Sequence, residues 1–188
     1  MYKSLPLFLI TLSLLGNFGA CAYAYQGYQY TQATPQKTQC KVIGVKDGDT
    51  IEVLIDGKPV VVRLANIDCP EKKQPFGNKA KWATSALVFG KMVTLVHYGK
   101  TDRYRRLIAE VILPNGLNVN KELVRRGLAW HFKKYSKDAS YAQLEDAARQ
   151  QKVGLWSQKD AVSPEQWRKM RKQRRREIRV ERWLFRKR

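Results

Sequence analysis

The chain has 188 residues, which suits one folded domain with extensions at its ends. Its 36 Lys and Arg residues against 16 Asp and Glu give a net charge of +20, which excludes an ordinary enzyme of small neutral metabolites and indicates a polyanionic partner such as nucleic acid. A hydrophobic content of 44% excludes a wholly disordered chain, and three Cys with two His and no Cys-x-x-Cys or His-Glu-x-x-His string argue against a disulfide scaffold or a zinc site.

The first 24 residues have the layout of a secretory signal peptide. Lys3 is their only charge, an apolar run covers residues 5–15, and Ala22-Tyr23-Ala24 is a small-x-small cleavage site. We therefore expect a secreted or periplasmic protein. Two alternatives stay open: an uncleaved membrane anchor, and lipid attachment at Cys21, because Phe18-Gly19-Ala20-Cys21 resembles a bacterial lipobox.

Composition divides the rest of the chain into three parts. Residues 25–37 lack an apolar period and are interpreted as a linker, residues 38–160 as the folded domain, and residues 161–188 as a basic helix or tail. In an oxidising compartment Cys40 and Cys69 could pair, but the sequence alone does not place them within bridging distance.

The folded part predicts a small β-barrel followed by helices. The expected elements are strands at 42–46, 51–55, 60–64, 92–98 and 107–113, and helices at 76–89, 118–126 and 140–152. The alternation of Ile51, Val53 and Ile55 and the Asp56-Gly57 turn mark a hairpin. Five short strands with a helix after the third favour an α+β fold built on a five-stranded OB-fold barrel.

The C-terminal segment from Ser163 is dominated by Arg and Lys. Ser163 is a suitable helix cap and Pro164 a suitable first helical residue, so we interpret the segment as a basic helix in contact with nucleic acid or an anionic surface. Its apolar stripe is incomplete, and a frayed, solvated tail is the alternative.

Six of the 16 acidic residues fall between Asp47 and Glu71, inside a strongly basic protein. Carboxylates hinder binding of a polyanion unless a cation bridges them, which argues for a hard divalent metal ion. Within the same range Arg63 interrupts an apolar strand, and further along the chain a cluster of Arg residues ends at Arg106. Together these are parts for phosphodiester cleavage: carboxylates to hold a cation, one to act as base, and two guanidiniums to clamp the phosphoryl oxygens.

Five strings in this order resemble the staphylococcal nuclease, or thermonuclease, family over roughly residues 40–157. They are Val-Lys-Asp-Gly-Asp-Thr (45–50), Val-Arg-Leu-Ala-Asn-Ile-Asp-Cys-Pro-Glu (62–71), Asp-Arg-Tyr-Arg-Arg (102–106), Val-Arg-Arg-Gly-Leu-Ala (124–129) and Gly-Leu-Trp (154–156). The resemblance implies an OB-fold endonuclease that depends on one Ca²⁺ ion and hydrolyses DNA and RNA with little sequence specificity, leaving 3′-phosphate ends.

The resemblance also implies roles for individual residues. Asp49 and Asp68 would bind Ca²⁺ through their carboxylates and Cys69 through its backbone carbonyl, with Asp47 supporting the metal from nearby. Glu71 would be the general base, and Arg63 and Arg106 would stabilise the transition state. The remaining matches are Tyr104 and Tyr135, at positions that contact the bound nucleotide.

Two departures from the family pattern bear on activity. Cys69 replaces a Thr or Ala, which a backbone ligand tolerates because every residue has a carbonyl. Arg105 stands where the family usually has Gly; if a positive φ is needed there, Arg105 strains the loop and misaims Arg106. The alternative interpretation is therefore a non-catalytic nucleic-acid-binding module on the same fold. Neither a repeat nor a heptad argues for an oligomer, so we expect a monomer.

Overall fold

The computed structural model describes residues 34–187; the predicted signal peptide and Cys21 lie outside them. The strands are β1 (Gln36–Asp47), β2 (Thr50–Ile55), β3 (Lys58–Leu64), β4 (Ile67–Asp68), β5 (Met92–Thr101), β6 (Leu107–Ile112) and β7 (Trp130–His131). The helices are α1 (Gly77–Val88), α2 (Val119–Arg125), α3 (Ala139–Gln150), the 3-10 helix η1 (Gly154–Ser157) and α4 (Pro164–Arg186).

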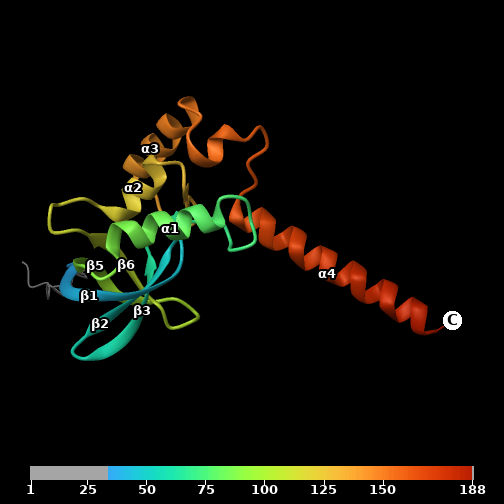
Figure 1. Cartoon of the computed structure of the whole chain (residues 1–188), viewed down its shortest axis with the longest axis horizontal. Coiled ribbons are helices and arrows are strands. Elements are labelled where there is room, and N and C mark those ends of the chain that lie inside the picture. The colour runs from blue at the N-terminus through green and yellow to red at the C-terminus, as the bar shows by residue number, and fades with distance from the viewer. Residues whose placement is uncertain (1–33, 188) are drawn as a thin grey trace, which may run out of the picture. The chain divides into compact units, whose positions relative to one another are not determined.

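The five long strands close into the predicted barrel, in the order β1-β2-β3-β6-β5 (Figure 1). Strands β3 and β6 are parallel and the other neighbours antiparallel. The apolar residues whose alternation predicts the strands also fill the interior of the barrel. Fully buried examples are Ile51, Val53, Val62, Leu95 and Val111. The α+β fold with an OB-type barrel and following helices is thus confirmed.

Strand β1 begins six residues earlier than the alternation predicts. Its first half, from Gln36 to Lys41, pairs with β5, but most of its side chains are polar and exposed, and only Cys40 is buried. A strand is recognised in a sequence by apolar residues that alternate at its buried positions. This half of β1 has a single buried residue, so its sequence does not predict a strand. The two-residue strands β4 and β7, which pair with each other, were also not predicted.

Helix α1 packs against the turn that joins β1 to β2. A Cβ atom at Gly48 would lie 2.8 Å from the Cβ atoms of both Ala80 and Cys69, so only glycine allows this approach. The Thr84 hydroxyl donates a 2.6 Å hydrogen bond to the carbonyl of Gly48 and fixes the turn to the helix. Helix α1 therefore fixes the position of the acidic turn between β1 and β2.

Cys40 and Cys69 are both buried and neither forms a disulfide, so the pairing left open by the sequence is not present. Each side chain packs in the core as a small apolar group.

The basic C-terminal segment is helical, as predicted. Ser163 and Gln166 form a reciprocal capping box at the start of α4, with Pro164 in the first turn. From Lys172 to Lys187 every side chain is exposed. Among residues 34–187, no helix combines the length and apolar character that a membrane crossing requires.

Candidate active site

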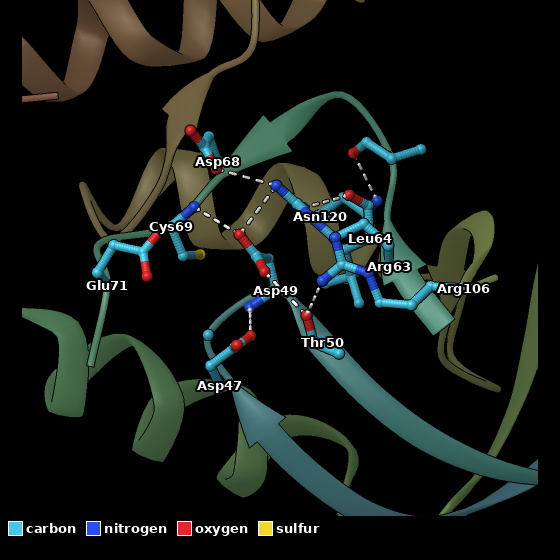
Figure 2. A network of polar contacts seen from close by, with 12 residues as sticks. Asp47, Asp49, Thr50, Arg63, Leu64, Asp68, Cys69, Glu71, Arg106 and Asn120 are labelled. Carbon is cyan, nitrogen blue, oxygen red and sulfur yellow. Dashed lines mark hydrogen bonds and ion pairs between the residues drawn. The ribbon is translucent and has the colours of Figure 1, made fainter. Parts of the chain in front are cut away.

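The acidic turn between β1 and β2 presents Asp49 at the end of the barrel. Asp49 is only 7% exposed, and three donors reach its carboxylate. The Thr50 hydroxyl donates to Oδ1 at 3.1 Å, and the backbone N–H of Cys69 donates to Oδ2 at 2.8 Å. The third donor is the Arg63 guanidinium, so the carboxylate has a fixed orientation (Figure 2).

Asp68 reaches the same place from another part of the chain. It ends β4, whose pairing with β7 sets its position, and it is 5% exposed. Nη2 of Arg63 lies 3.0 Å from Oδ1 of Asp68 and 3.1 Å from Oδ2 of Asp49, so both carboxylates converge on one nitrogen (Figure 2). Arg63 can do this because its strand register places it opposite Thr50, next to Asp49.

Negative charge at this point is only partly compensated. Burial, and then the charge of Asp49, raise the pKa of Asp47 to about 6. Burial likewise raises the pKa of Asp68, against the opposing effect of its hydrogen bond from Arg168. Carboxylates whose ionised form is disfavoured in this way provide a favourable place for a further cation.

Arg106 is oriented by the loop between β5 and β6. Its Nε donates to Oδ2 of Asp102 at 2.7 Å, and its Nη1 donates to the Thr50 hydroxyl at 3.0 Å. Oδ1 of Asp102 accepts the backbone N–H groups of Tyr104 and Arg106 and closes the loop. Arg105 has φ +61°, so this position does need the left-handed conformation, yet Arg106 keeps its partners.

Glu71 lies beside Asp68, and the two are joined by a residue from the C-terminal helix. Nη1 of Arg168 lies 2.8 Å from Oε1 of Glu71, and its Nη2 lies 2.9 Å from Oδ2 of Asp68. The site therefore includes a third arginine, contributed by α4.

All nine residues singled out in the sequence line one open cleft of about 1280 Å³. They are Asp47, Asp49, Arg63, Asp68, Cys69, Glu71, Tyr104, Arg106 and Tyr135. Tyr104 and Tyr135 are 63% and 72% exposed, so their rings are available for stacking on a ligand. The cleft joins acidic groups, arginines and exposed aromatic rings, which suits a phosphate-linked ligand that carries aromatic bases.

The carboxylates do not form a complete metal cage by themselves. Within the described residues, no three His, Cys, Asp or Glu side chains are grouped so as to hold a metal ion. Two convergent carboxylates and a backbone carbonyl are hard oxygen donors, which suit Ca²⁺ when water and a ligand phosphate complete its shell. In chemistry, the donor set fits such an ion.

Three residues of the site have no role in the sequence-based prediction. Thr50 and Asp102 lie within the recognised strings but were given no role, although both hold Arg106. Arg168 lies outside all five strings. The Ser163 cap and the basic residues around Arg168 indicated only that residues 163–188 could form a basic helix.

Comparison with known proteins gives consistent matches. Residues 61–158 match the family model described as staphylococcal nuclease homologue. An uncharacterized endonuclease of Escherichia coli is 47% identical over 131 residues, covering 68% of this chain and 83% of the relative. A second uncharacterized endonuclease, from Haemophilus influenzae, is 44% identical over 138 residues, which cover 73% of this chain and 76% of the relative. A micrococcal nuclease of Shigella flexneri is 37% identical over 139 residues, which cover 69% of this chain and 79% of the relative.

Proposed function

The chain belongs to the staphylococcal nuclease family, and from this we propose that it is a Ca²⁺-dependent endonuclease that hydrolyses DNA and RNA and leaves 3′-phosphate ends. The observation that carries the proposal is the convergence of Asp49 and Asp68 on Arg63, next to Glu71 and Arg106, in one cleft. Little sequence specificity is expected, because contacts to phosphate carry no information about the bases.

The side chains suggest a division of labour. Asp49, Asp68 and the carbonyl of Cys69 would hold Ca²⁺, with Asp47 nearby. The bound ion would neutralise phosphate charge and help to place the attacking water. Glu71 would accept the proton of that water as it attacks phosphorus.

The arginines would act on the phosphoryl group. Arg63 and Arg106 are directed into the cleft and would donate hydrogen bonds to its oxygens as negative charge develops. The water oxygen would bond to phosphorus as the bond from phosphorus to the 5′ oxygen breaks. The 5′ oxygen would leave as a hydroxyl group after taking a proton from solvent water, and the phosphate would stay on the 3′ oxygen. Tyr104 and Tyr135, at the rim of the cleft, would contact the nucleotide.

The alternative, a non-catalytic nucleic-acid-binding module, requires that strain at Arg105 turns Arg106 away from the cleft. The contacts of Arg106 with Asp102 and Thr50 favour the enzyme, because the guanidinium is fixed despite the backbone conformation of Arg105.

The decisive experiment incubates the purified protein with plasmid DNA in Ca²⁺ and in chelator. Cleavage should occur only with Ca²⁺. Glu71→Ser should keep DNA binding and lose cleavage, whereas Glu52→Ser, which removes a carboxylate paired with Lys46 outside the cleft, should cleave normally. Cleavage in chelator would contradict the metal requirement, and cleavage by Glu71→Ser would contradict the role of Glu71.

For localisation, we propose that residues 1–24 direct export and are then removed. Mass spectrometry of protein recovered from periplasm and medium tests this: a chain beginning at residue 25 supports it, and an intact N-terminus or a lipid-modified Cys21 contradicts it.

A further inference from the structure

The basic residues of α4 are not distributed evenly around the helix. Six of them are spaced alternately by four and three residues, which places them on one face of an α-helix. We call this set the basic stripe; it consists of Arg168, Lys172, Arg175, Arg179, Arg182 and Arg186. At about 1.5 Å per residue, the stripe is about 27 Å long.

The opposite side of the helix has a different character. It carries Met170, Glu177, Glu181 and Leu184, together with Arg174. Two of the three acidic residues of the helix thus lie away from the stripe and leave its positive charge unopposed. Beyond Arg168, no stripe residue makes an ion pair within residues 34–187, so these cations are free to bind an external anion.

The stripe begins inside the cleft. Its first member, Arg168, contacts Glu71 and Asp68. The first turn of α4 is fixed by the capping box at Ser163 and by a 2.7 Å hydrogen bond from Nε2 of Gln74 to the carbonyl of Val162. Figure 1 shows α4 as one unbroken helix, so the face that Arg168 directs toward the carboxylates continues along its length.

We propose that the basic stripe binds the sugar-phosphate backbone of the strand that enters the cleft. The inference rests on the proposed nuclease function, since it assigns a binding surface for the same substrate. One cation on each turn, all on one side and joined to the catalytic cleft, matches a linear polyanion. Arg168 would connect the basic stripe to the cleft, and it would exchange its carboxylate partners for a phosphate of the strand.

An anionic membrane is less well matched by the same helix. Helices that lie in the membrane interface need a continuous apolar face opposite the basic one. Here Glu177, Glu181 and Arg174 interrupt that face. The observations therefore favour nucleic acid, and membrane binding becomes an outcome to be tested.

The experiment compares two triple variants of the full chain that lose the same charge. One changes the stripe residues Arg175, Arg179 and Arg182 to Gln; the control changes Lys169, Arg174 and Lys187, which lie off the stripe, to Gln. Gln is a good helix former, and circular dichroism checks that helix content is unchanged. Binding to a fluorescent single-stranded oligo(dT) of about 20 nucleotides is followed by anisotropy in chelator at several salt concentrations.

The stripe triple should bind on the order of tenfold more weakly than wild type at about 0.1 M salt, and its log–log salt slope should be smaller by about 2. The control triple should stay close to wild type. Equal weakening of both triples, or none in the stripe triple, overturns the proposal. So does a stripe triple that keeps oligonucleotide binding but loses binding to phosphatidylglycerol-containing vesicles.

Because the assay contains chelator, its result does not depend on cleavage. Failure of the nuclease proposal would be seen separately, as absence of Ca²⁺-dependent plasmid cleavage by the wild-type protein.

Discussion

The guanidinium of Arg168 bridges Glu71 and Asp68, with Nη1 2.8 Å from Oε1 of Glu71 and Nη2 2.9 Å from Oδ2 of Asp68. The two carboxylates proposed as base and metal ligand are thus both paired with a cation from the C-terminal helix. A divalent ion and Arg168 would satisfy the same negative charge, so they should compete.

Replacing Arg168 with Gln should therefore strengthen Ca²⁺ binding in the absence of nucleic acid. Arg168 is 44% exposed, so each of its pairs contributes modestly, and we expect about three- to tenfold tighter binding by isothermal titration calorimetry. The control is Lys169→Gln, whose ion pair is with Glu165. Unchanged or weaker Ca²⁺ binding by Arg168→Gln would show that the guanidinium does not compete.

Asp102 should be a positioning residue for Arg106. Its carboxylate holds both the guanidinium of Arg106 and the backbone of the loop, so Asp102→Ala should lower kcat by about tenfold to a hundredfold. Asp102→Asn keeps an acceptor and should recover part of the loss. The control Asp146→Ala removes an exposed carboxylate of α3. A wild-type kcat for Asp102→Ala would mean that Thr50 alone suffices to orient Arg106.

Arg105→Gly should stabilise the protein. A left-handed conformation costs an L-residue roughly 1–2 kcal/mol, of which the greater freedom of Gly in the unfolded chain cancels a part. We expect a gain of about 0.5–1 kcal/mol, measured by urea unfolding. Arg103→Gly removes the same charge at a position without positive φ and should not stabilise. Equal effects of the two changes would attribute the gain to charge.

Local patterns predicted the barrel because alternating apolar residues in β2 and β3 have to face inward wherever one side of a strand is buried. The first half of β1 escaped prediction because its stability comes from pairing with β5, a contact between distant segments with mostly polar side chains. The same holds for β4 and β7, each of which is too short to show a period.

The contents of the cleft were predictable in part. The strings that end at Thr50 and Arg106 lie at the starts of β2 and β6, and barrel closure brings these two starts together on either side of Arg63. Asp68 joins them through the separate pairing of β4 with β7, which the sequence did not predict. Arg168 could not be predicted in this way, since it lies about a hundred residues from its partner Asp68 on a segment whose composition alone suggested only a basic surface. Its position follows from the tertiary anchoring of α4.

Glu122 should make stability depend on pH under acidic conditions. Hydrogen bonds from Arg125 and then from Arg126, at 2.7 Å, lower the pKa of Glu122 from its ordinary 4.5 to about 2. Because the folded pKa lies below the unfolded one, the stabilisation is complete above about pH 4.5 and disappears as the pH falls toward 2. Glu122→Gln should therefore melt well below wild type at pH 6, with the difference in Tm closing toward pH 2, whereas Asp146→Asn should follow the wild-type curve. A Tm difference that does not change with pH would assign the loss to packing instead of the ion pairs.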